Sequence, residues 1–135
     1  MTAAPTRMIT IDDLDRDELL NLLHRIGLWR PADLVWAQWE VASHRWQAAW
    51  AEYMRLGDVA HEAVMASIAA TDALATAARD PAANIKTLAR LRRASIAAST
   101  VAEQARDRED RARAKANRLA RRQEALYALH RELSP

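Results

Sequence analysis

The stretch that decides the fold is residues 88–133, LARLRRASIAASTVAEQARDREDRARAKANRLARRQEALYALHREL. It contains neither glycine nor proline, and from Leu91 onward an apolar residue recurs at every seventh position. A seven-residue apolar repeat of this length is typical of an α-helix that lies along another helix with a left-handed twist. The repeat consists of Leu91, Ala98, Ala105, Ala112, Leu119, Leu126 and Leu133.

A second seven-residue series runs beside the first and is mixed in character. Most residues in the middle of the two series are small, which permits a facing helix to approach closely, whereas leucines lie at both ends. Alanine supplies close to half of the apolar residues, so close helix contact must replace bulky packing in this chain. The second series is Leu88, Ser95, Ala102, Glu109, Ala116, Gln123 and His130.

Glycines and prolines suggest where the helices begin and end. Pro31 suits the first position of a helix, and Gly27 and Gly57 suit the position that follows a helix C-terminus. The dipeptide Asp80-Pro81 is typical of an N-cap followed by a first helical residue. The sequence therefore predicts a disordered lead, residues 1–9, and one domain, residues 10–135, with helices at about 11–26, 31–56, 59–78 and 81–133.

No segment alternates apolar and polar residues over a strand length, so the fold class is all-α. We expect a small helical bundle of about four helices with a long, heptad-patterned C-terminal helix, and a break at the charged residues 107–110 stays open. The helix of residues 59–78 is too short to cover that C-terminal helix. Either the helix of residues 31–56 covers the remainder, or the distal part projects and pairs with another molecule, which is the favoured expectation.

Four tryptophans of the second predicted helix share one stripe. Trp36 and Trp50 belong to one seven-residue series, and Trp39 and Trp46 belong to another that is offset by three. Aromatic residues at helical spacing usually face the core, and that is the favoured interpretation; an interface or a platform for stacking bases is the alternative. The opposite side of the helix is also apolar, which indicates burial on two sides. The predicted protein-interface residues are Trp36, Trp39, Trp46, Trp50, Leu119 and Leu126.

Charge is divided between the two halves of the chain. Residues 1–78 carry six arginines against eleven acidic residues, a net charge of −5, and residues 79–135 carry a net charge of +7. The formal total of +2 hides this division. A basic half attracts either a nucleic-acid backbone or an acidic protein surface, including the acidic half of another copy.

The basic residues of the C-terminal helix are the best candidates for a binding site. Several recur at helical spacing and share one face, which suits contact with phosphates. Neighbouring acidic residues allow ion pairs such as Asp107–Arg111 and Asp110–Arg113, so a solvated face is the alternative. The predicted nucleic-acid-binding residues are Lys86, Arg90, Arg93, Arg108, Arg111, Lys115, Arg118 and Arg122.

Motifs for catalysis or metal binding are weak. The chain has no cysteine, its four histidines are not spaced to form a helical metal pair, and its two glycines match no phosphate-binding loop. We therefore expect no enzyme, no cofactor, no metal and no small-molecule substrate. No stretch is apolar enough to span a membrane and the first residues do not resemble a secretion signal, so the expected location is cytoplasmic.

These observations favour a non-enzymatic helical subunit of a nucleoprotein assembly. Its basic C-terminal helix would contact the nucleic-acid backbone without reading sequence, and its tryptophan- and alanine-rich helices would contact neighbouring protein or another copy. Small helical subunits of RNA-guided effector complexes are an example of this class. The alternative is a protein-interaction module, such as a phage-type adaptor or inhibitor, that uses the C-terminal helix as a coiled-coil arm. Eighteen arginines against two lysines indicate a bacterial or phage genome rich in GC.

Overall fold

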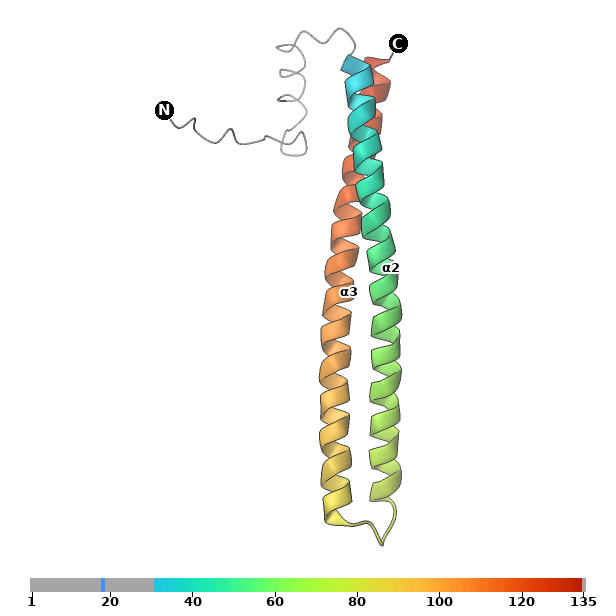
Figure 1. Ribbon diagram of the computed structural model, residues 1–135, viewed down its shortest axis with the longest axis vertical. Coiled ribbons are helices and arrows are strands. Elements are labelled where there is room, and N and C mark those ends of the chain that lie inside the picture. Colours follow the sequence, from blue (N-terminus) through green and yellow to red (C-terminus); the bar gives the residue numbers. More distant parts are fainter. Residues whose placement is uncertain (1–17, 19–30, 135) are drawn as a thin grey trace, which may run out of the picture. The chain divides into compact units, whose positions relative to one another are not determined.

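The computed structural model describes residue 18 and residues 31–134 of the chain (Figure 1). Within these residues the regular structure is two long helices, α2 (Pro31–Ala78) and α3 (Ile85–Leu133), and there is no strand. The prediction of an all-α fold is confirmed for this part of the chain, which holds two long helices where three were expected.

Two predicted segments lie outside the described residues. They are the lead of residues 1–9 and, apart from the exposed Glu18, the helix of residues 11–26. The described residues fall into two compact units. Unit 1 comprises residues 31–44 and 121–134, and unit 2 comprises residues 45–120.

The predicted break at Gly57 is wrong, because α2 runs through this residue without interruption. A Cβ atom built on Gly57 would meet its nearest heavy atom, the Glu109 Oε1 of α3, at 3.4 Å, which is ordinary van der Waals contact. The glycine thus occupies an interior helical position beside α3. A glycine in a helix interior costs only about 1 kcal/mol relative to alanine, which the packing of a long helix can outweigh.

The C-terminal helix begins four residues later than predicted. Asn84 caps α3, since its side-chain Oδ1 accepts a hydrogen bond from the backbone N–H of Lys86 at 2.8 Å. Asp80 instead accepts the backbone N–H of Ala82 at 2.9 Å and shapes the turn between the helices. Aspartate and asparagine are equally good caps, and the chain needs the intervening residues to reverse direction. No break occurs at residues 107–110.

Unit 2 is an antiparallel helical hairpin closed by this turn, as the ribbon in Figure 1 shows. The hydroxyls of Ser67 and Ser99 share a hydrogen bond of 3.0 Å, and those of Thr71 and Ser95 share one of 3.1 Å. The partner on α3 moves back four residues as the residue on α2 moves forward four, which fixes the register. Such short side chains can meet across the two helices only because the residues between the backbones are small.

Unit 1 contains the core of larger residues. Val35 and Ala42 of α2 are buried against Leu126 and Leu129 of α3. The Gln123 Nε2 donates a hydrogen bond to the Ser43 Oγ at 3.2 Å beside this core. The expected projection of the distal part of the C-terminal helix is therefore wrong, because residues 31–44 at the start of α2 cover that part.

Burial along both helices is concentrated on the sides that face each other. Every residue of the two seven-residue series in α3 is buried or half-buried. On α2 the buried residues are small, namely Val35, Ala42, Ala49 and Ala60. The fully buried positions of α2 are occupied by small residues, because two closely spaced helices leave no room there for an indole ring.

Candidate nucleic-acid interface

The predicted nucleic-acid-binding residues all lie on α3, and nearly all are exposed. Seven of them belong to unit 2, and the eighth, Arg122, belongs to unit 1 and is half-buried. Lys86, Arg90 and Arg93 lie in the first turns of α3, near the end of the hairpin. The structure therefore divides the predicted set into a group at the hairpin end and a group around the middle of α3.

Three residues of the middle group, Arg108, Arg111 and Lys115, line a shallow groove between the two helices of unit 2. Two adjoining hollows make up this basic groove, and they share Glu52, Ala112 and Lys115. Arg108 and Arg111 line one hollow, with the aliphatic floor of Leu56, Val59 and Ala112 between the helices. The lining residues are Arg45, Ala48, Ala49, Glu52, Arg55, Leu56, Val59, Arg108, Arg111, Ala112, Lys115 and Leu119.

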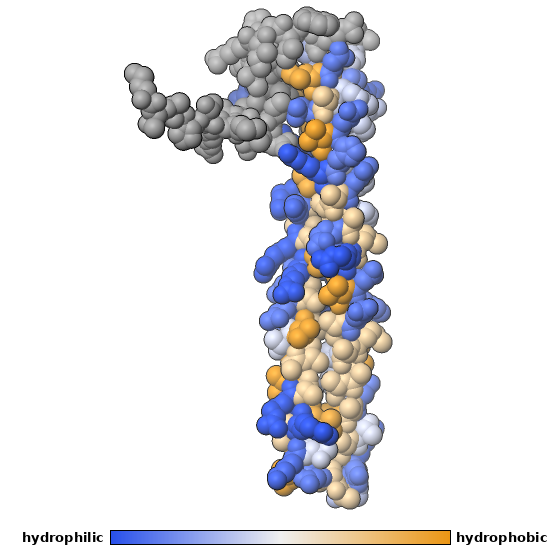
Figure 2. Space-filling model, in the orientation of Figure 1, coloured by the Kyte–Doolittle hydropathy of each residue, from blue (hydrophilic) through white to orange (hydrophobic). Residues whose placement is uncertain are grey.

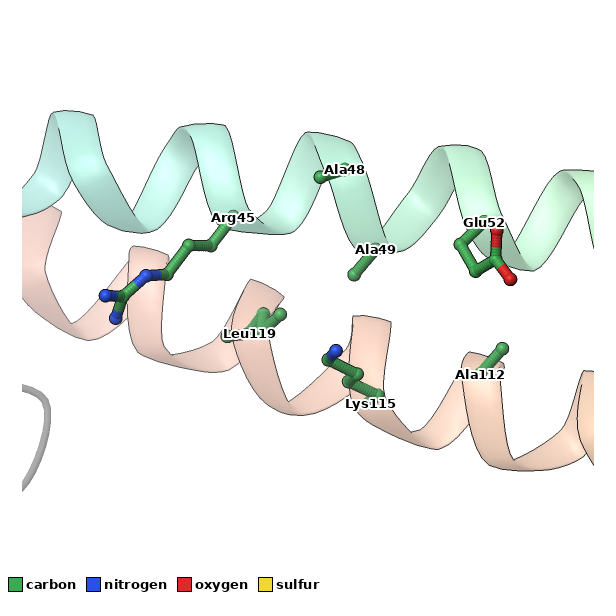
Figure 3. A pocket seen from close by; sticks show the side chains of 7 residues that line it. All are labelled: Arg45, Ala48, Ala49, Glu52, Ala112, Lys115 and Leu119. Carbon is green, nitrogen blue, oxygen red and sulfur yellow. The ribbon is translucent and has the colours of Figure 1, made fainter.

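Figure 3 shows the hollow nearer to Arg45. Ala49 from α2 and Leu119 from α3 point into the space between the helices and form its apolar floor. The longer polar side chains of Arg45, Glu52 and Lys115 stand along its edges. A narrow apolar floor with flexible cations along the rim suits an elongated anion, which the cations can follow without a fixed binding geometry.

Glu52 is the one acidic residue in the lining of the groove. Its carboxylate accepts hydrogen bonds from the Arg55 guanidinium, from Nε at 2.9 Å and from Nη2 at 2.6 Å. These hydrogen bonds are the main reason why the pKa of Glu52 lies below its usual value, and the charges of Arg55 and Lys115 add to the effect. The same pair raises the pKa of Arg55. Glu52 therefore stays ionised and neutralises part of the positive charge of the groove.

Three cations of the groove make no ion pair with any described residue, namely Arg108, Arg111 and Lys115. Of the two ion pairs that the sequence suggested, Asp110–Arg113 forms at 3.0 Å, whereas Asp107–Arg111 is not made. Arg108, Arg111 and Lys115 are exposed and share one face of α3. They are thus available to an anion from outside the described part of the protein.

Arg45 and Arg55 are groove residues that the sequence analysis missed. Both belong to α2, where they are the two basic residues of an otherwise acidic helix. Arg45, Glu52 and Val59 are spaced seven apart and flank the inward-facing series of the buried Ala42 and Ala49 and the half-buried Leu56. That spacing is visible in the sequence, but it identifies a groove only when the facing helix is known to be α3.

The tryptophans are less buried than expected. Trp36 and Trp50 are 37% and 44% exposed, whereas Trp39 and Trp46 are half-buried, so the core interpretation is wrong for the first two. In unit 1 the rings of Trp36 and Trp39 stack, with centroids 4.6 Å apart. In unit 2 Trp50 contacts Trp46 and Tyr53, with centroids 6.3 and 5.3 Å apart.

The two leucines of the predicted protein interface differ in their surroundings. Leu126 is 7% exposed and packs inside the core of unit 1, so it contacts this chain rather than another. Leu119 is half-buried and lines the basic groove. Of the predicted interface residues, the exposed Trp36 and Trp50 are therefore better placed than the two leucines to contact another protein.

Three kinds of comparison give no relative of known function. No protein-family model, no curated protein and no solved structure matches this chain. Among the described residues, no three His, Cys, Asp or Glu side chains are grouped so as to hold a metal ion. Neither of the two long helices has a stretch that is apolar enough for a membrane span.

Proposed function

We propose that the protein is a non-enzymatic helical subunit of a nucleoprotein assembly and that it holds a nucleic-acid backbone in the basic groove of unit 2. The observation that carries the proposal is the row of exposed cations Arg108, Arg111 and Lys115 along one face of α3, which make no ion pair with any described residue. Arg118 continues this face by one turn. Cations in such a row neutralise successive phosphates and release the counterions bound to them.

The groove is better suited to contact with the phosphate backbone of a nucleic acid than to recognition of its bases. The floor of the groove is aliphatic, and its lining contains no aromatic side chain on which a base can stack. Its polar side chains are mostly arginines, whose planar forks bind phosphate oxygens. The proposed binding is therefore electrostatic and independent of sequence.

A protein-interaction module is the second candidate function, and the exposed Trp36 and Trp50 favour it. Tryptophan is enriched among the residues that dominate protein interfaces. In each unit α3 already lies against α2, so α3 is not free to act as a coiled-coil arm unless α2 moves away. The exposed indoles therefore support this alternative better than α3 does.

The test is a binding titration with labelled single-stranded RNA, single-stranded DNA and duplex DNA, followed by fluorescence anisotropy. The double variant Arg108→Gln/Arg111→Gln removes two groove cations and should weaken binding at least tenfold. The matched control is Arg92→Gln/Arg121→Gln, which removes the same charge from exposed positions of α3 outside the groove lining. Equal losses in both variants would mean that net charge, and not the groove, holds the nucleic acid.

A further inference from the structure

Unit 2 has a second surface, on the side where Ser67 meets Ser99 and Thr71 meets Ser95. On α2 this side carries two adjoining rows of residues, each with seven-residue spacing. The rows contain no Asp, Glu, Lys or Arg over almost 30 residues, although 28% of the chain is charged. We call this surface the uncharged lane, and it consists of Gln47, Trp50, Met54, Gly57, His61, Val64, Ile68, Thr71 and Ala75.

Large apolar side chains of the uncharged lane are open to solvent. Trp50 is 44% exposed, Met54 is 53% exposed and Ile68 is 48% exposed. In Figure 2 pale-orange to orange surface reaches the solvent between blue, hydrophilic side chains along the hairpin. A continuous uncharged row with exposed large residues is typical of a protein contact.

The register of the hairpin assigns this lane a centre. Gly57 lies beside Glu109, and Ser67 lies beside Ser99, so His61 lies level with Ala105 of α3. Met54 and Ile68 lie seven residues before and seven residues after His61. On α3 an acidic and a basic residue, Glu103 and Arg106, flank the same level. On both helices, residues of matching or opposite character therefore lie on either side of the level of His61.

We propose that this side of unit 2 pairs with the same side of a second copy, about a twofold axis at the level of His61. The axis runs α2 antiparallel to α2 of the other copy, so Met54 of each copy meets Ile68 of the other. On α3 the same axis brings Glu103 of each copy to Arg106 of the other. The four charges sum to zero, so the pairing matches apolar side chains on α2 and opposite charges on α3.

The other twofold arrangement of two hairpins fits the residues less well. It would place α2 of one copy over α3 of the other at the same level, so Glu103 and Arg106 would be covered by His61 and Val64. Burial of charges against apolar side chains without partners is unfavourable. The antiparallel pairing also leaves the basic groove open, since Arg108, Arg111 and Lys115 lie outside the paired surface. The inference does not depend on the proposed function, because the two surfaces are separate.

The first test is the mass of the full chain in solution by sedimentation equilibrium. We expect a dimer of the 15.2 kDa chain, and Met54→Glu/Ile68→Glu should weaken dimerisation at least 100-fold. Met65→Glu is the matched control: Met65 is 51% exposed on α2 but lies outside the uncharged lane, so this variant should remain dimeric. A monomeric wild-type chain, or equal weakening by Met65→Glu, would overturn the proposal.

Charge reversal tests the axis itself. Glu103→Arg places four positive charges at the axis and should weaken the dimer at least tenfold, and Arg106→Glu should do the same with four negative charges. The double variant Glu103→Arg/Arg106→Glu restores opposite charges and should recover the wild-type affinity. Failure of the double variant to recover, with helicity unchanged in circular dichroism, would contradict the proposed pairing of α3.

A distance across the dimer distinguishes the two arrangements. The chain has no cysteine, so Ala82→Cys in the exposed turn gives one spin-label site per copy. The turn lies about 20 residues from His61, so antiparallel pairing separates the two labels by about 60 Å at 1.5 Å per residue. In the other arrangement the two hairpins point in the same direction and their turns lie close together. Label distances below about 30 Å, half of the separation expected for antiparallel pairing, would therefore support that arrangement.

Discussion

Gly57 illustrates how one residue changes the architecture of this protein. A glycine that ended a helix would adopt a left-handed backbone conformation, and alanine there would be strained. Gly57 instead lies within α2 and has ordinary space for a Cβ atom beside Glu109. The two alternatives therefore predict opposite signs for the same substitution.

We predict that Gly57→Ala stabilises the protein by about 0.5–1 kcal/mol, because alanine is the better residue in a helix interior. Urea denaturation followed by circular dichroism at 222 nm measures the change in the free energy of unfolding. A loss of stability from this substitution would instead support a helix end at this position.

Glu52 is the residue through which the groove is tuned. Its carboxylate offsets one positive charge among the five basic residues that line the groove. Replacing it by glutamine removes this negative charge and releases Arg55 from its ion pair. We predict that Glu52→Gln tightens nucleic-acid binding several-fold in the anisotropy titration. Unchanged affinity would indicate that the bound strand does not pass Glu52.

The Glu52–Arg55 pair also gives a defined pH dependence. The pKa of Glu52 in the folded protein is lowered from 4.5, mainly by the hydrogen bonds from Arg55. A lowered pKa means that the pair contributes stability above pH 4.5 and that this contribution disappears as the pH falls through the lower, folded-state value. The difference in stability between the wild type and Glu52→Gln should therefore be present at pH 6 and shrink as the pH falls below 4.5 towards the lower pKa of the folded state. A difference that persists in acid would contradict the pairing.

At the scale of the helices, the start of α3 tests how the hairpin is closed. The Asn84 Oδ1 accepts a hydrogen bond from the backbone N–H of Lys86 at the start of α3. The Asp80 Oδ1 accepts one from the backbone N–H of Ala82 in the loop between the helices. We predict that Asn84→Ala costs about 1 kcal/mol of stability, as the loss of a helix cap does, and that Asp80→Ala costs less. Urea denaturation of the two variants compares them directly. The reverse order would place the cap at Asp80.

The helices also show which features of the fold the sequence can predict. The absence of strands from residues 31–134 and the helical nature of residues 85–133 follow from periodicity and from the lack of glycine and proline in the C-terminal helix. The continuity of α2 does not, because glycine is the usual signal of a helix end and residue 57 is kept helical by packing on α3. The same limit applies to Asp80 and Asn84, two residues with equal capping ability.

The sequence predicted only part of the candidate site, because helical spacing is a local property whereas the pairing of α2 with α3 is not. Arg108, Arg111 and Lys115 share a face through helical spacing alone, so the sequence identifies them. Arg45 and Arg55 join them only through the pairing of α2 with α3, which is a long-range property. The choice between two apolar sides of α2 also depended on this pairing, because close contact selects alanine and excludes Trp36 and Trp50 from the core.

For the whole molecule, the separation of charge between the helices is the feature to be explained. α2 carries six acidic and two basic residues, whereas α3 carries thirteen basic and six acidic residues. Pairing of the two helices within the chain does not cancel this excess, because Arg108, Arg111 and Lys115 make no ion pair with the described residues. We propose that this excess binds an outside anion and that the uncharged lane on the other side of unit 2 binds a second copy.

The most direct measurement is the slope of the logarithm of the binding constant against the logarithm of salt concentration, for duplex DNA and for single strands. If Arg108, Arg111, Lys115 and Arg118 each neutralise a phosphate, the slope should be about −3.6 for duplex DNA and about −2.8 for single strands. The variant Arg108→Gln/Arg111→Gln should then show a slope closer to zero by about 1.8 on duplex DNA. No binding at low salt, or a slope that these substitutions leave unchanged, would contradict the proposal that the basic groove holds a nucleic-acid backbone.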